Sequence, residues 1–193
     1  MIGIFAMAVA AAAEGAPPTV FGLEFGKTLS IPVCRHQVLP GGTVSITYES
    51  EPAVTCYEPD IQLSDAPWRR GSVDFPTDRK PLVTKINMIN TLIIDGRLEG
   101  LEVSTPDHNH TLLIVDELTK KFGKPTEVRH QQAEVEGIAV PALEFTWRPH
   151  GLTVTYTNID DDMDYGSIEI ETPAMQRLRH DHDENASKAR TAL

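Results

Sequence analysis

Two clusters of histidine and carboxylate side chains are the first places where this sequence could bind a metal. His108-Asn109-His110 follows Asp107, and His180-Asp181-His182-Asp183-Glu184 lies near the C-terminal end. A His-x-His pair in a strand points both rings to one side and can hold Zn²⁺. We expect a helix entry at the first cluster and a tail at the second, so neither fixes such a geometry. We therefore predict solvated histidines and no metal; the alternative is a metal site whose third ligand the sequence does not supply.

The acidic loop Asp160–Gly166 is the second candidate for ion binding. Asp160, Asp162 and Asp164 alternate, and Glu171 occupies the twelfth place of a calcium-type loop. The sixth place, however, is Tyr165 rather than Gly, and strands rather than helices should flank the loop. We predict a solvated hairpin tip.

Motifs for nucleophilic or nucleotide chemistry are absent from the sequence. There is no Gly-x-Ser-x-Gly elbow, Walker-type phosphate loop or dinucleotide fingerprint. His36, His130 and His150 are isolated, and carboxylates are too numerous to nominate an acid and a base. Catalytic residues are therefore unknown, we predict no cofactor, and we lean towards a non-enzymatic protein.

The two cysteines, Cys34 and Cys56, predict a disulfide. An even cysteine count in an exported chain is typical of a structural disulfide. Closing this loop should contribute roughly 3 kcal/mol in the chain-entropy model. The alternatives are two free buried thiols or half of a metal site.

The N-terminal residues 1–13 predict a secretory signal peptide. Residues 2–13 are apolar and uncharged, and Ala11-Ala12-Ala13 offers the small residues that signal peptidase needs before Glu14. The segment lacks Lys and Arg, so either the signal is atypical or the start codon lies further upstream. The alternative is an Ala-rich helix in a cytosolic protein. No later segment reaches 18 apolar residues, so we expect no transmembrane segment in the mature chain and a periplasmic or secreted location.

The charge of the chain excludes two classes of partner. Asp and Glu number 28 against 17 Lys and Arg, which gives a net charge of -11. Nucleic acids and anionic membrane surfaces require a cationic face. We therefore predict no nucleic-acid partner.

The secondary-structure elements that must position any site are most clearly predicted between Thr91 and Val128. This stretch predicts a strand, a turn, a strand, a helix and a strand. Asp95-Gly96 is a strong hairpin signal. Gly100 lies where the apolar face changes sides, as a β-bulge requires. The main helix should run over about 108–122, and Gly123 followed by Pro125 should end it.

The apolar stripe of this helix should contain Leu112, Val115, Leu118 and Phe122, with Ile114. Asp116 with Lys120, and Glu117 with Lys121, should form ion pairs on its outer face.

The remaining chain predicts a single α+β domain over 14–178 followed by a mobile tail over 179–193. Residues 21–25 alternate as a strand or form a loop that packs two Phe rings, and Val44 to Tyr48 form a short strand. The Pro-rich segment 34–83 should be an irregular excursion held by the disulfide. Within it Trp68 either caps the edge of the core or contacts a partner.

The C-terminal part predicts an antiparallel meander that forms the floor for the helix. Thr126–Gln132 and the alternating runs of 143–147, 152–156 and 168–170 should be strands, whereas Val135–Ala142, with Gly137 and Pro141, predicts a loop or ragged edge. Thr172-Pro173 could start a short final helix.

The chain contains, in this order, Phe21-Gly22-x-x-Phe25-Gly26 before a Cys, a second Cys in a Pro-rich stretch, residues 118–125, Trp147 and residues 166–170. In this order of motifs it resembles uncharacterised exported proteins of Gram-negative bacteria. The resemblance implies a periplasmic or secreted location and supplies no activity. Our leading hypothesis is a non-enzymatic module that binds a protein or envelope partner. The alternative is a periplasmic hydrolase or small-ligand binder with a site under the 34–83 excursion.

Overall fold

The structure is a mixed α+β fold. The elements predicted between Thr91 and Val128 from turn and helix signals form part of it. The computed structural model describes residues 17–34, 36–38, 44–48, 52–59, 66–160 and 164–191. The predicted signal peptide, residues 1–13, lies outside the described residues, as do residues 161–163 of the acidic loop.

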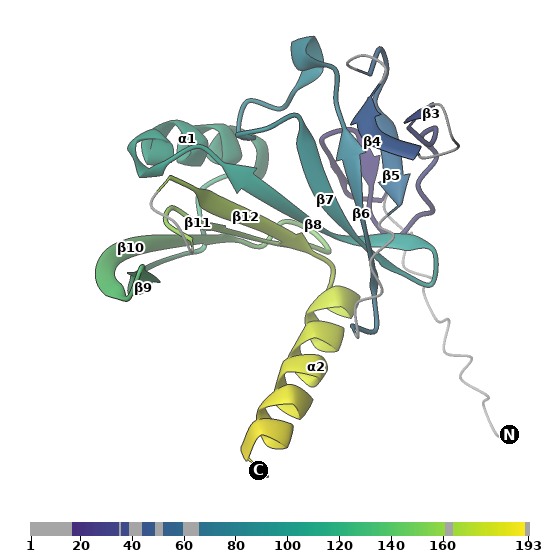
Figure 1. Cartoon of the computed structure of the whole chain (residues 1–193). Helices are drawn as coiled ribbons and strands as arrows, with labels where there is room; N and C mark the ends of the chain where they lie inside the picture. Colours follow the sequence, from purple (N-terminus) through teal and green to yellow (C-terminus); the bar gives the residue numbers. More distant parts are fainter. Residues whose placement is uncertain are drawn as a thin grey trace, which may run out of the picture.

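The main sheet is antiparallel and has eight strands within the described residues (Figure 1). In spatial order they are β5 (Cys56–Pro59), β6 (Arg69–Asp74), β7 (Met88–Ile94), β8 (Arg97–Thr105), β12 (Gly166–Glu171), β11 (Thr153–Thr157), β10 (Ile138–Trp147) and β9 (Glu127–Val135). The sheet is strongly twisted, so β5, β6 and β7 run at a steep angle to β9–β12 (Figure 1). β5 and β6 belong to the segment that we predicted to be irregular.

The β7–β8 hairpin contains both predicted irregularities. Asp95 and Gly96 adopt φ angles of 48° and 77°, which suit the two-residue turn. Leu92 pairs with Gly100 and Ile93 with Leu98, so Glu99 is the extra residue of a bulge. A Cβ at position 100 would lie 2.9 Å from Leu92 Cδ1, which explains why glycine occupies the bulge.

The main helix, α1 (Thr111–Phe122), follows a 3-10 turn, η2 (His108–His110), and ends at Gly123, as predicted. Ile114 and Leu118 are buried, but Leu112 is 85% exposed, so its predicted place on the buried stripe is wrong. Lys120 bonds both acids, 2.7 Å from Asp116 and 2.7 Å from Glu117, whereas we expected Glu117 to pair with Lys121.

The two faces of the sheet differ in polarity. Inward residues such as Ile93, Leu101 and Ile168 form one core with α1. On the opposite face Asn90, Glu102, Glu169 and Thr155 lie side by side across four strands. This alternation is typical of an antiparallel sheet with one packed face. The opposite face is covered locally, for example where Leu92 packs with Trp68 and Met175.

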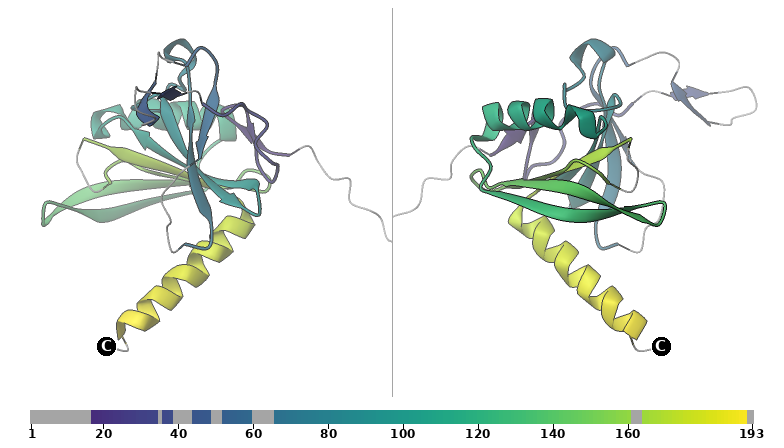
Figure 2. Two further views of the ribbon diagram at one scale, coloured as in Figure 1. Left: turned by 45° about the vertical axis from the view of Figure 1, so that its right-hand side comes forward. Right: turned by 90° about the vertical axis from the view of Figure 1, so that its left-hand side faces the viewer.

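The last helix, α2 (Pro173–Thr191), lies on the side of the sheet opposite to α1 and projects away from it (Figure 2). It is much longer than the short helix that we predicted and runs through most of residues 179–193, the predicted tail. Among the helices of the described residues, none combines the length and apolar composition needed to cross a bilayer.

The N-terminal segment begins with a small hairpin rather than the single strand predicted for 21–25. β1 (Thr19–Val20) and β2 (Leu23–Glu24) flank a turn at Phe21-Gly22. Leu23 and Phe25 are buried in the main core, and Phe21 packs partly against it, which agrees with the alternative of a loop that buries the Phe rings.

A separate two-stranded sheet pairs β3 (His36–Val38) with β4 (Val44–Tyr48), the latter as predicted. A 3-10 turn, η1 (Thr77–Arg79), lies between β6 and β7.

The predicted loop over Val135–Ala142 is wrong, because β9 and β10 form a long hairpin there. Its turn is Glu136-Gly137, with φ angles of 51° and 78°, and Pro141 pairs in register with Gln132. This hairpin makes β9 one edge of the sheet.

Candidate binding groove

Within the described residues, neither histidine cluster lies beside a third side chain that could complete a metal site. His110 Nδ1 lies 2.9 Å from Asp107 Oδ1 at the start of α1, and this hydrogen bond lowers the pKa of Asp107. His182 lies on α2, with its ring edge against Trp68 at 5.2 Å between centroids. The first contact belongs to the start of α1, and the second belongs to the packing of α2 against Trp68.

The acidic loop connects strands β11 and β12. Glu171, the twelfth residue of the calcium-type pattern, lies at the far end of β12, where its Oε1 accepts a hydrogen bond of 2.7 Å from Arg179. Asp160 N donates to Tyr165 O at 3.0 Å, which closes the loop through its backbone.

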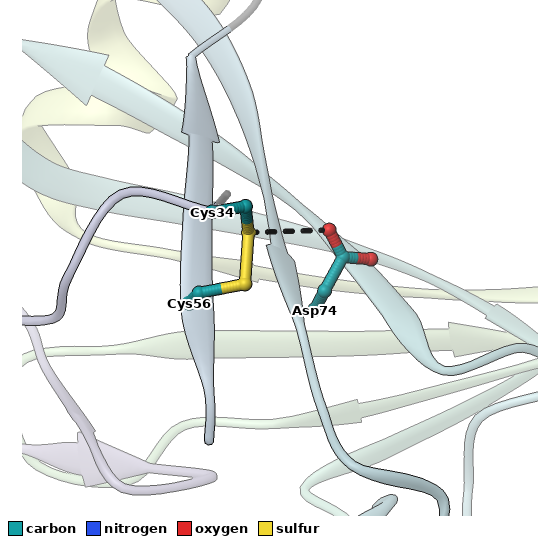
Figure 3. Close-up of side chains that lie close together, drawn as sticks. All are labelled: Cys34, Cys56 and Asp74. Carbon is teal, nitrogen blue, oxygen red and sulfur yellow. Dashed lines mark hydrogen bonds between the residues drawn. A yellow bond between two sulfur atoms is a disulfide. The ribbon is translucent and has the colours of Figure 1, made fainter. Parts of the chain in front are cut away.

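The disulfide between Cys34 and Cys56 is confirmed, with Cα atoms 4.9 Å apart (Figure 3). The buried Asp74 side chain places Oδ2 3.7 Å from Cys34 Sγ. The oxidised sulfur carries no hydrogen, so this is a contact between sulfur and a carboxyl oxygen rather than a thiol hydrogen bond. Although the three side chains lie close enough to hold a metal ion, neither sulfur is a thiolate ligand while the disulfide is intact.

Trp68, our candidate partner contact, is only 9% exposed and packs with Leu92 and Met175 beneath α2. The Arg179 guanidinium lies 5.8 Å from its ring. In this conformation the ring fastens α2 to the sheet, which matches the alternative of a cap over the core edge.

Arg179 adds a charge network beside Trp68. It forms ion pairs with Glu102, Glu169 and Glu171, at 3.2, 3.8 and 2.7 Å. Burial raises the pKa of Glu169, and Glu171 and Glu102 add to this, while Arg179 opposes it. Arg70 also bonds Glu102, so two cations serve three carboxylates and the network retains net negative charge.

A groove of about 680 Å³ lies beside the disulfide, and its wall is the N-terminal strap, which we define as residues 27–34. One end of the strap bonds to β8, where Leu98 N donates to Lys27 O at 2.8 Å. The other end bonds to β5 through Tyr57 N to Pro32 O and Cys34 N to Tyr57 O, at 2.8 and 2.9 Å. Because β5 and β8 flank β6 and β7, the strap spans these two strands.

The groove is lined mainly by apolar side chains. From the strap come Leu29, Ile31 and Val33, and from the sheet come Tyr57, Pro59, Pro67 and Ile93. The Tyr57 ring lies directly over Gly71, where there is no room for a Cβ. The close approach of ring and backbone forms part of the groove floor.

Two arginines give the groove its polarity. Strand pairing sets Arg69 opposite Ile93, so both residues lie on the groove face. Arg70 also lines the groove but alternates to the other face, where its Nη2 donates to both Glu102 carboxylate oxygens at 2.9 and 3.0 Å. Asp95 is the only carboxylate of the described groove lining.

A second concavity, of about 400 Å³, lies between the β9–β10 hairpin and β11–β12 on the polar face. Its acids include Glu134, Glu144, Asp160 and Glu169. An acidic surface of this kind is expected for a chain with a net charge of -11 and by itself indicates no ligand.

Sequence reasoning located the groove only coarsely, as a site under the 34–83 excursion. It missed the strap residues, because their position depends on hydrogen bonds to β8 and β5 that no local pattern predicts. The available signal was Arg69-Arg70, an adjacent pair of cations in an acidic chain.

Comparison of the chain with models of protein families, with curated proteins and with solved structures finds no match.

Proposed function

We propose that this protein is an exported, non-enzymatic module that binds a protein or envelope partner in the groove beneath the N-terminal strap. The observation that carries the proposal is the groove itself, which combines an apolar lining with an arginine on its face. Val33, on its rim, is 63% exposed, although large apolar side chains usually lie inside a protein. With Leu29 and Ile31, Val33 adds apolar surface to the groove, and binding sites are usually lined mainly by apolar side chains.

Export is supported by the disulfide and by the apolar N-terminal segment of the sequence. Disulfides persist in oxidising compartments, such as the periplasm or the extracellular space. We therefore place the partner in the same compartment.

A second candidate function is small-ligand binding. The groove volume of about 680 Å³ lies within the range of small-molecule sites, roughly 300–1,000 Å³. The groove is about half open to solvent, whereas small-ligand sites bury most of their ligand, and this favours the partner.

Site-specific photo-cross-linking in the native host tests the proposal. A photoreactive phenylalanine derivative replaces Val33 in one variant and Ile138, at the tip of the β9–β10 hairpin, in the other. The two positions are matched in exposure, at 63% and 65%. We expect one discrete product from position 33, none from position 138, and recovery in the periplasmic or medium fraction.

Identical products from both positions, or none from position 33, would contradict binding in the groove. Recovery in the cytosol would contradict export. If position 33 gives no product but a small molecule raises the melting temperature of the protein, the second candidate replaces the first.

A further inference from the structure

Arg69 is a cation on the face of the groove. Within the described residues it forms no ion pair, whereas its neighbour Arg70 is held by Glu102. Arg69 is exposed on the face that also carries Ile93, between Pro67 and the Asp95-Gly96 turn. A guanidinium in this position can donate two parallel hydrogen bonds to a carboxylate, in a bidentate geometry.

The charge of the groove lining differs in sign from the charge of the whole chain. The whole chain has a net charge of -11, yet the described groove lining contains two arginines against one aspartate. With Arg70 engaged by Glu102, Arg69 and Asp95 remain as the groove's charged side chains. A carboxylate at Arg69 would be flanked by apolar surface, where charge-assisted hydrogen bonds are screened less than in open water.

The strap offers a second kind of contact. Residues 28–31 form no backbone hydrogen bond with other described residues, although the strap is bonded on both sides, at Lys27 and at Pro32. Within the part of the chain that the structure describes, no other backbone group bonds to the amides and carbonyls of this stretch. Unpaired backbone beside side-chain pockets is the arrangement by which domains bind extended peptides.

From these two observations we propose that the groove binds an extended segment of a partner polypeptide that has a carboxylate flanked by apolar side chains. This inference rests on the proposed function and adds the chemistry of the ligand. The carboxylate bonds to Arg69, the apolar side chains contact Ile31, Val33 and Tyr57, and the segment backbone bonds to residues 28–31. Side-chain and C-terminal carboxylates share this chemistry.

Peptide selection on the disulfide-bonded protein tests the inference. A phage-displayed library of random peptides is selected on the wild type, and binding of the synthetic peptides is measured by calorimetry. We expect selected peptides to contain Asp, Glu or a free C-terminus next to apolar residues. C-terminally amidated copies then separate the two sources of the carboxylate.

Three variants assign the carboxylate contact. Arg69→Ala should weaken peptide binding about tenfold or more, the usual effect of losing a charge-assisted hydrogen bond. Arg69→Lys should restore part of the affinity, because it keeps the charge but not the planar fork. Arg177→Ala, which removes an exposed arginine on α2, is the matched control and should leave affinity unchanged.

Selected peptides without a carboxylate, or equal affinities for Arg69→Ala and the wild type, would overturn the inference. Arg69-dependent binding to vesicles of phosphatidylglycerol, without peptide binding, would overturn it in favour of a lipid anion. If position 33 still cross-links a partner in these cases, the proposed function stands without this ligand chemistry. If it does not, both fail.

Discussion

Replacement of both cysteines, Cys34→Ala with Cys56→Ala, should destabilise the protein without unfolding it. The disulfide fixes the strap end beside β5, next to the backbone bonds between Cys34 and Tyr57. Other anchors of the N-terminal segment are independent of it, because Leu23 and Phe25 are buried in the main core. The folded state should therefore persist, and the main effect should fall on the unfolded state.

The magnitude follows from the length of the closed loop. The cysteines are 22 residues apart in sequence, and in the chain-entropy model a loop of this size contributes about 3 kcal/mol at 25 °C. The two buried sulfur atoms that the double variant lacks would add a smaller packing loss. The slope of the free energy against denaturant should also rise, because the unlinked unfolded chain exposes more surface.

Urea unfolding monitored by tryptophan fluorescence measures both quantities. The wild type in excess reductant is the second comparison, since it breaks the bond while retaining both side chains. A loss of less than about 1 kcal/mol in both samples would refute the entropic argument, because the model predicts three times as much. Complete unfolding of the double variant would show instead that the strap has no sufficient anchor besides the disulfide.

Two further predictions concern α1 and the charge network. Leu118→Ala should cost about 2–5 kcal/mol of unfolding free energy because Leu118 is buried, whereas Leu112→Ala, at an exposed position, should change it by about 0.5 kcal/mol or less in urea unfolding. Equal effects would contradict the observed helix orientation. The folded-state pKa of Glu169 lies above its ordinary value of 4.5, so its ionisation costs stability as pH rises through that range. Glu169→Gln should thus be more stable than the wild type at neutral pH but not below pH 4.5 in the same assay. A constant difference at all pH values would contradict this assignment.

Local chemistry was sufficient for the elements from β7 to α1. Asp95-Gly96 and Gly123 each adopt positive φ angles that few other residues tolerate, so these positions specify a turn and a helix end without tertiary context. The orientation of α1 was misjudged at Leu112. It lies six positions before Leu118, which places the two side chains about 120° apart around the helix axis.

Non-local contacts explain what was missed. The β6 sequence around Arg69-Arg70-Gly71 lacks apolar alternation, and it becomes a strand because β5 and β7 supply partners on both sides. The later part of α2 has no apolar stripe that would predict it; its helix-forming residues and the Glu184–Lys188 pair at 3.0 Å support it.

The sequence indicated a region near the disulfide but neither the groove nor its composition. The disulfide pointed to the 34–83 segment, and Trp68 drew attention to it. The groove depends on Leu29 and Ile31, which are ordinary apolar residues until the strap is bonded at both ends. Arg69, which we propose binds the carboxylate, directly follows Trp68.

The position of the strap has a further consequence for self-association. An eight-stranded antiparallel sheet has two edges, and an uncovered edge is a template for pairing with another molecule. At β5, the outward N–H and C=O of Tyr57 are taken up by Pro32 and Cys34, and the disulfide keeps them there. At β9, Arg129 and Glu134 supply exposed charges instead. Reduction would therefore uncover one edge and leave the other as it is, which links the oxidation state of this protein to its tendency to aggregate.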